Sequence, residues 1–243
     1  MARRLRTTLP ALSGLLAAAT AFVAFESRAI AFEFGAGLMG VAGGNFQNKP
    51  DRRPTDPNNN PGFGGTTVGG GLMLDGRVLD GLLGLEVDVL RTTDSGGGDV
   101  TVNGVTGHVK ISQGAWHVPI LFKLTIPSPV VAPMFFVGPE IVAPGSHDGS
   151  VDGPFSAVVT VHSKSDTYTM LTLGGGVEIK LPLPILDLRI PIGLRLSYNP
   201  GLSDKYADRT TNTINATGTS GDVTYSSEMK YAVSATLGAA LYF

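Results

Sequence analysis

The sequence predicts an all-β fold, an eight-stranded antiparallel up-and-down transmembrane β-barrel over residues 32–243, preceded by a signal peptide over residues 1–31. Three observations predict it. Apolar residues alternate with small or polar ones along eight segments, the connections between these segments alternate between short and long, and the 243 residues contain 33 glycines but no cysteine. Without disulfides, the domain has to be held together by burial, hydrogen bonds and ion pairs, and glycines inside strands permit a sheet to bend.

The first 31 residues have the three parts of a secretory signal peptide. Three arginines within the first ten residues make a basic start, an uncharged apolar stretch follows over residues 11–25, and Ala29-Ile30-Ala31 provides a small-x-small cleavage site. The alternative is a transmembrane anchor, but a spanning helix needs about 20 apolar residues. We therefore expect Ala29 and Ala31 to direct cleavage after Ala31, so that the mature chain begins at Phe32.

Eight segments alternate as lipid-facing barrel strands do, because consecutive side chains of a strand point to opposite faces. The clearest segment is 230–243, whose apolar face has Tyr231 and Phe243 at its two ends and small or polar residues behind it. The apolar faces of the other seven segments fall within residues 32–38, 68–74, 83–89, 116–124, 135–141, 171–179 and 186–196. Eight is an even number and the smallest one common among membrane barrels.

The connections alternate in length. Short ones are expected near residues 78–81, 127–133 and 181–184, and long polar loops near residues 44–65, 93–113, 145–166 and 202–228. Outer-membrane barrels have short periplasmic turns and long external loops. The best later candidate for a membrane helix, residues 119–142, is interrupted by Lys123, Glu140 and several prolines. A membrane crossing therefore has to be made by a closed sheet.

The inward faces of the predicted strands carry many charged residues. The interior of an eight-stranded barrel is just wide enough for side chains to fill it, and an isolated charge there would cost several kcal/mol. We therefore predict a structural ion-pair network in the lumen, with a path for protons or solutes as the alternative. Its predicted members are Glu86, Asp88, Lys123, Glu140, Glu178, Lys180, Asp187, Arg189, Arg195 and Lys230, and Asp75 and Arg77 also face inward.

Four motifs resemble, in the same order, strands of the PorT-like outer-membrane β-barrel family. H-V-P-I-L-F-K over residues 117–123 is similar to the family's E-I-P-L-L-L-K, and M-F-F-V-G-P over residues 134–139 is similar to Y-L-x-A-G-P. G-G-G-V-E over residues 174–178 is similar to G-x-G-V-E, and R-L-S-Y-N-P-G-L over residues 195–202 is similar to R-Y-S-Y-G-L. The resemblance implies a small bacterial outer-membrane barrel and no shared catalytic residues.

Residues that could carry out catalysis are few. The four histidines are His108, His117, His147 and His162, and three of them fall in predicted loops. His147 with Asp148, and His162 with Ser163, could be combined into a catalytic triad or a metal site, but no second ligand pair has metal-binding spacing. We predict no catalytic residue, cofactor or metal.

These patterns predict an integral outer-membrane protein of a Gram-negative bacterium that is exported by its signal peptide. We expect a monomer with a structural or surface-interaction role. A narrow porin-like channel for small solutes and a lipid-modifying enzyme are the alternatives. The expected partners are outer-membrane lipid, a surface ligand held by the long loops, and the barrel-assembly machinery, for which Tyr231, Leu241 and Phe243 would form a C-terminal signal. Loss of the arginine-rich leader leaves a domain more acidic than the whole chain, whose formal net charge is −2, so no nucleic-acid partner is expected.

Overall fold

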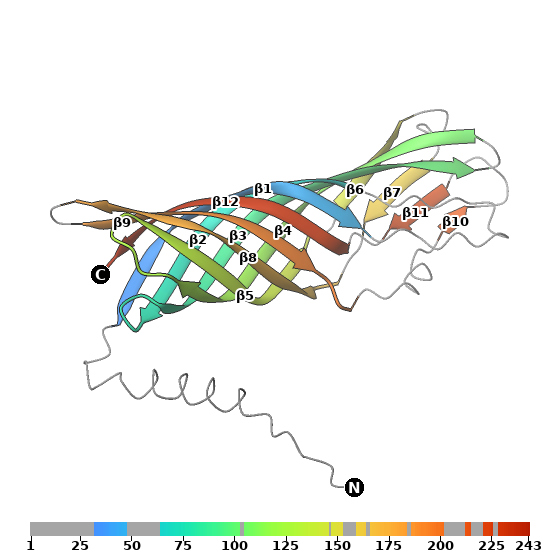
Figure 1. The fold of residues 1–243 in the computed structure, drawn as a ribbon. Coiled ribbons are helices and arrows are strands. Elements are labelled where there is room, and N and C mark those ends of the chain that lie inside the picture. The colour runs from blue at the N-terminus through green and yellow to red at the C-terminus, as the bar shows by residue number, and fades with distance from the viewer. Residues whose placement is uncertain are drawn as a thin grey trace, which may run out of the picture. The chain divides into compact units, whose positions relative to one another are not determined.

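The computed structural model describes residues 32–47, 64–102, 105–145, 147–152, 159–163, 166–183, 186–201, 212–214, 221–225 and 228–243. Eight strands in this part of the chain form the barrel: β1 (Glu33–Gln47), β2 (Gly64–Val78), β3 (Leu83–Val102), β4 (Val105–Thr125), β5 (Val131–Pro144), β8 (Tyr168–Pro182), β9 (Asp187–Tyr198) and β12 (Met229–Tyr242) (Figure 1). Within the described ranges, no helix is long and apolar enough to cross a membrane.

The barrel is closed because each of these strands pairs with two neighbours, in the order β1-β2-β3-β4-β5-β8-β9-β12 and back to β1. Every pairing in this ring is antiparallel. Each of the eight predicted segments lies in one of these strands, so the predicted fold class is confirmed. The connections 79–82 and 126–130 lie at one end of the barrel together with the paired ends of β8 and β9 at Pro182 and Asp187, and we call this the short-turn end.

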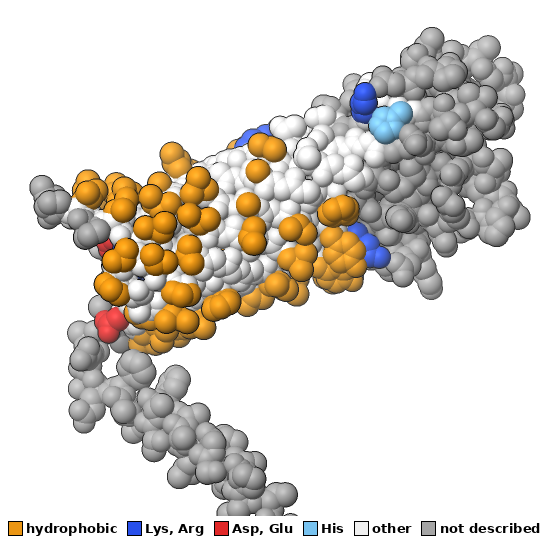
Figure 2. All heavy atoms as spheres, turned by 45° about the horizontal axis from the view of Figure 1, so that its top comes forward, with side chains coloured by type: hydrophobic (Ala, Val, Ile, Leu, Met, Phe, Trp, Pro, Cys, Tyr) orange, Lys and Arg blue, Asp and Glu red, His pale blue; other side chains and the backbone are white. Residues whose placement is uncertain are grey.

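The strands expose one face and bury the other, as β5 illustrates. Phe135 and Val137 are 56% and 48% exposed on the outer wall, whereas Met134 and Phe136 between and beside them are buried in the lumen. Hydrophobic side chains gather over the barrel wall in the same way on the face that Figure 2 shows. The exterior is therefore apolar, and the packed core of the protein is the lumen.

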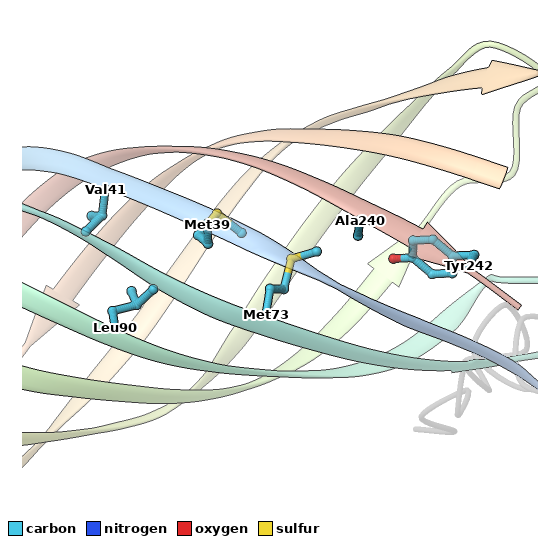
Figure 3. Close-up of a cluster of buried hydrophobic side chains, with 6 residues drawn as sticks. All are labelled: Met39, Val41, Met73, Leu90, Ala240 and Tyr242. Atoms are coloured by element: carbon cyan, nitrogen blue, oxygen red, sulfur yellow. The ribbon is translucent and has the colours of Figure 1, made fainter. Parts of the chain in front are cut away.

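Part of that lumen is filled by apolar side chains from four neighbouring strands. Figure 3 shows this cluster, which consists of the buried residues Met39, Val41, Met73, Leu90, Ala240 and Tyr242. They come from the neighbouring strands β1, β2, β3 and β12. Two further buried apolar clusters lie among the other strands, Ala115, Val142, Met170 and Met229 in one and Leu121, Met134 and Phe136 in the other. Buried polar and charged side chains occupy the space between these clusters.

The prediction of a loop over residues 93–113 is wrong. β3 and β4 continue their antiparallel ladder through this segment as far as the pair Val102 and Val105. Its glycines and polar residues are typical of a loop, but its valines and threonines favour a strand, and two strands that are already in register can extend their ladder without a new closure cost.

Four short strands accompany this hairpin: β6 (His147–Asp152), β7 (Val159–Ser163), β10 (Asn212–Ile214) and β11 (Gly221–Tyr225). β6 pairs with β4, β7 with β6, β11 with β7 in parallel, and β10 with β11. Figure 1 shows them beyond one end of the barrel, which we call the extended end. The predicted loops 145–166 and 202–228 thus contain strands, and residues 48–63 of the remaining predicted loop lie outside the described residues.

Candidate functional site

The polar part of the lumen contains two groups of interacting side chains. The first, which we call the Arg77 cluster, lies toward the short-turn end and has four cations and four carboxylates. Its members are Arg77, Lys123, Arg189, Arg195, Asp75, Glu86, Asp88 and Glu178, together with the hydroxyl of Tyr242. All nine residues are buried, and they project inward from β2, β3, β4, β8, β9 and β12.

Arg77 is the centre of this cluster. Its Nη1 donates to Glu178 Oε1 at 2.9 Å, its Nη2 also contacts Glu178 Oε2, and Nη2 is 2.7 Å from Asp75 Oδ2. The same Nη2 donates to the Tyr242 hydroxyl at 2.6 Å, and that hydroxyl donates to Asp75 Oδ2 at 2.7 Å. Because β2 and β8 are four steps apart in a ring of eight strands, the pair of Arg77 and Glu178 crosses the full width of the lumen.

A second pair crosses the lumen beside the first. Arg195 on β9 places its Nη2 2.6 Å from Asp88 Oδ2 and 3.1 Å from Glu86 Oε1, and both carboxylates are on β3, four steps around the ring. Lys123 then joins the two pairs, since its Nζ is 2.6 Å from Glu86 and 3.0 Å from Asp75. The result is one continuous network, in which each charge faces an opposite one in a region that water does not reach.

The network ends in a more exposed group at the short-turn end. Arg189 Nη2 is 2.5 Å from Asp187 and 2.9 Å from Glu33, and its Nη1 is 3.7 Å from Glu178. Asp187 is exposed, so this end of the network is accessible to solvent. Lys180 is half-buried opposite Arg189 in the β8–β9 register, with no ion pair to a described residue.

The second group, which we call the His117 cluster, lies toward the extended end. His117 Nδ1 is 2.6 Å from Glu140 Oε1, and its Nε2 is 3.3 Å from Asp94 Oδ2. Both ring nitrogens therefore face acceptors, an arrangement that the protonated imidazolium satisfies. Glu140 Oε2 accepts from Ser197 at 2.8 Å and also from Thr172. These five residues come from β3, β4, β5, β8 and β9, which are consecutive in the ring.

A small cavity lies between the two clusters. Its volume is about 30 Å³, and its lining includes His117, Glu140 and Ser197 from one cluster and Arg195 from the other. A cavity of this size is large enough to hold a water molecule. Toward the short-turn end, the centre of the lumen is filled by the buried side chains of the Arg77 cluster.

Sequence reasoning did not include His117, Asp94, Thr172, Ser197 and Tyr242 in the lumen network. Four of them stand at inward positions of predicted strands. The two-residue alternation of side-chain direction therefore could have identified them as lumen residues. Asp94 was assigned to a loop, because the extension of β3 was not foreseen. Neutral polar residues at inward positions thus have to be counted together with the charged ones.

The remaining predicted residues lie elsewhere. Lys230 is half-buried near the extended end, with its Nζ 5.9 Å from the centre of the Tyr231 ring. Tyr231 stacks on Tyr198 on the outer wall at 5.3 Å, and Leu241 lies on the same outer face. Phe243 is 78% exposed, and its backbone N–H donates to the carbonyl of Phe34 at 2.9 Å. Ala29 and Ala31 lie outside the described residues.

The candidate catalytic pairs fall in the extension of the sheet. The β6–β7 register places Asp148 opposite His162, and His147 opposite Ser163. Their side chains are outside what the structure describes. Among the described side chains, no group of three or more histidine or acidic residues is arranged to hold a metal ion.

The fold and the lumen define the class: a small closed β-barrel with an apolar exterior and an ion-paired interior. No family model and no curated protein matches the chain, so the resemblance to the PorT-like family stays a prediction. Among solved structures it is similar to Ail, the attachment invasion locus protein of Yersinia pestis, solved in complex with the heparin analogue sucrose octasulfate. That match has a TM-score of 0.42 and 14% identity, and covers 87% of this chain and 99% of Ail.

Two further structures are similar. The outer membrane protein OprG from Pseudomonas aeruginosa gives a TM-score of 0.44 at 12% identity, with 87% of this chain and 95% of OprG covered. The translocator domain of the autotransporter NalP from Neisseria meningitidis gives a TM-score of 0.28 at 8% identity, with 96% and 95% covered. With TM-scores below 0.5, none of these likenesses bears on function, which has to be argued from the chain's own residues.

Proposed function

We propose that the chain is an integral outer-membrane β-barrel of a Gram-negative bacterium, with a closed lumen and a non-catalytic role in surface interaction. The observation that carries this proposal is the pair of contacts across the lumen, Arg77 to Glu178 and Arg195 to Asp88. They fill the one route through the ring, so the activity of the protein has to be located on its surfaces.

The outer wall supports a place in a membrane. Its exposed side chains include Leu38, Phe122 and Leu194, each about two-thirds exposed, and similar residues on every barrel strand. An apolar surface of this extent is typical of contact with lipid, and the closed ring leaves no strand edge unpaired in the hydrocarbon. The predicted signal peptide supports export to the outer membrane.

The lumen argues against a pore. Asp75, Asp88 and Glu178 are completely buried, and Arg77 and Lys123 nearly so. A continuous path for hydrated ions would expose these groups to water along its length. The ion pairs therefore act as a plug that also holds opposite strands together.

The extended end supports a role in contact with other molecules. There the β3–β4 hairpin continues beyond the barrel and carries β6, β7, β11 and β10 as added strands. In an outer-membrane barrel this end faces the outside of the cell. A projecting sheet offers backbone and side-chain groups to a surface ligand, which the plugged lumen does not.

Conductance in planar bilayers tests the proposal. We expect purified wild-type protein to give no stable conductance steps, because the plug remains in place. Part of the same sample is run unheated and heated on a gel, since the mobility shift of a folded barrel shows that the protein was inserted in its native form. Stable ion-selective steps from folded protein would overturn the closed-lumen proposal in favour of the channel.

The barrel-assembly machinery is the proposed partner during insertion. Tyr231 and Leu241 lie on the outer face of β12, the strand that closes the ring against β1, and the exposed Phe243 follows its last residue. Deleting Phe243 removes two backbone hydrogen bonds to Phe34 as well as the exposed ring. We expect lower outer-membrane levels with unchanged export to the periplasm, measured by fractionation, and unchanged outer-membrane levels would refute the assembly role.

A further inference from the structure

Among the described outward positions between the short-turn end and Trp116, one holds a charged residue. Arg91 of β3 is exposed at an outward position, next to Trp116 of β4. From the short-turn end up to Trp116, every other outward position described on the eight barrel strands holds an apolar residue, glycine, proline, threonine or tyrosine. A cation in such a wall is expensive unless it lies where polar groups can reach it.

Arg91 and Trp116 form a structured pair. They are directly opposite in the β3–β4 register, and the guanidinium carbon lies 5.5 Å from the centre of the Trp116 ring. The side chain extends across Gly114, where an added Cβ would come within 2.2 Å of Arg91 Nη2. Glycine at this position thus leaves room for the guanidinium to lie flat against the wall.

The guanidinium keeps its hydrogen-bonding capacity. The described residues offer it the face of the Trp116 ring, and none of them forms an ion pair with it. An arginine carries five N–H donors in a planar fork, which matches the oxygens of a phosphate. The pair therefore has donors and a positive charge available on the outside of the barrel.

The pair of Arg91 and Trp116 lies where the outward residues of β3 and β4 change from apolar to small or polar. Toward the short-turn end the neighbouring outward residues are Val89 and Val118, and toward the extended end they are Thr93 and Gly114, followed by Ser95 and Ser112. A tryptophan at such a boundary is typical of the interface between hydrocarbon and headgroups. Arg91 therefore lies at the depth where lipid phosphates are found.

We propose that Arg91 and Trp116 bind the phosphate headgroup of an anionic lipid, with the guanidinium on the phosphate and the indole against the adjoining glycerol and acyl chain. This inference rests on the proposed membrane location and adds a specific lipid contact to it. Charge complementarity carries it: the one cation on an apolar wall, freely accessible, faces the layer that contains anionic groups.

Trp116 makes the site measurable because it is the only tryptophan in the chain. The folded protein is placed in phosphatidylcholine vesicles that contain a small fraction of either brominated phosphatidylglycerol or brominated phosphatidylcholine, and quenching of Trp116 reports which lipid is adjacent. In low salt we expect the anionic lipid to be preferred by about fivefold, the effect of one basic residue at an anionic surface. The preference should fall as salt is added.

Matched variants isolate the arginine. Arg91→Gln should abolish the preference for phosphatidylglycerol, and Arg91→Lys should retain part of it, since the charge remains without the fork. Lys110→Gln, which removes an outward cation further along β4, should leave the preference unchanged.

The outcomes separate the two proposals. Protein that shows no heat-dependent gel shift in any vesicle would overturn the membrane location and the lipid site together. Inserted protein whose Trp116 is quenched equally by both lipids, or whose preference survives Arg91→Gln, would overturn the lipid site alone.

Discussion

The Arg77 cluster and the His117 cluster occupy the same lumen but make contacts over different distances around the ring. The pairs of Arg77 with Glu178 and Arg195 with Asp88 connect strands on opposite sides of the ring. The contacts of His117 and Glu140 connect strands that are one or two steps apart on one side of the ring. The first cluster uses guanidinium and ammonium groups, whereas the second uses one imidazole and two hydroxyls.

This difference indicates different roles. Contacts between opposite strands fix the width of the ring and fill its centre, so they close the route through the barrel. Contacts between strands one or two steps apart reinforce a sheet that backbone hydrogen bonds already hold, and a cavity of about 30 Å³ lies beside them. We therefore expect the Arg77 cluster to close the lumen and to provide most of the stability that polar contacts contribute.

The largest expected effect is that of Arg77→Met. The substitution leaves Glu178 and Asp75 buried without the guanidinium between them, and removing one partner of a buried ion pair costs about 3–5 kcal/mol. The free energy of unfolding, measured by urea titration of the protein in lipid vesicles, should fall by this amount. Conductance should also appear, because the central side chain of the plug is shortened.

Lys180→Met is the matched control for this prediction. Lys180 lies on the same inward face, near the short-turn end, but it is half-buried and makes no ion pair with a described residue. Its loss should cost less than about 0.5 kcal/mol. If Arg77→Met is no more destabilising than Lys180→Met, the central role of the Arg77 cluster is wrong.

A smaller effect is expected for His117→Leu. Asp94 and Glu140 lose a hydrogen-bond partner, but Glu140 keeps the hydroxyls of Ser197 and Thr172, so the cost should be about 1–3 kcal/mol. The barrel should remain non-conducting in planar bilayers, in contrast to Arg77→Met. Conductance in His117→Leu equal to that in Arg77→Met would show that both clusters close the lumen.

The inward and outward faces of the barrel could be predicted from the sequence, and the reason is geometric. Side-chain direction repeats every two residues in a strand, so the position of Lys123 relative to Phe122 follows from their order alone. The same rule placed Glu86, Arg195 and Glu178 in the lumen. Each of these predictions needed only local sequence, which is why the eight segments match the eight barrel strands.

The partners across the lumen could not be predicted in this way. The contact of Arg77 with Glu178 joins residues 101 positions apart, and it depends on how far each strand is shifted against the next around the whole ring. Local sequence indicates only neighbours across a short turn, such as Glu178 of β8 and Arg189 of β9, whose charged atoms lie 3.7 Å apart. The extension of β3 was missed for a related reason, because pairing with β4 stabilises a glycine-rich segment that has weak strand propensity by itself.

The smallest expected effect, that of Tyr242→Phe, examines the centre of the Arg77 cluster without removing a charge. The hydroxyl accepts from Arg77 and donates to Asp75, while the ring lies 3.9 Å from the guanidinium carbon of Arg189. Loss of the hydroxyl should lower the free energy of unfolding by about 1 kcal/mol, since the ring and both of its charged neighbours remain.

Tyr231→Phe on the outer wall is the control and should change the free energy of unfolding by less than about 0.5 kcal/mol. A cost for Tyr242→Phe that approaches the value for Arg77→Met would mean that the hydroxyl, and not the ion pair across the lumen, holds the network together. Equal costs for the two tyrosine variants would mean that Arg77 and Asp75 are already satisfied by their ionic partners.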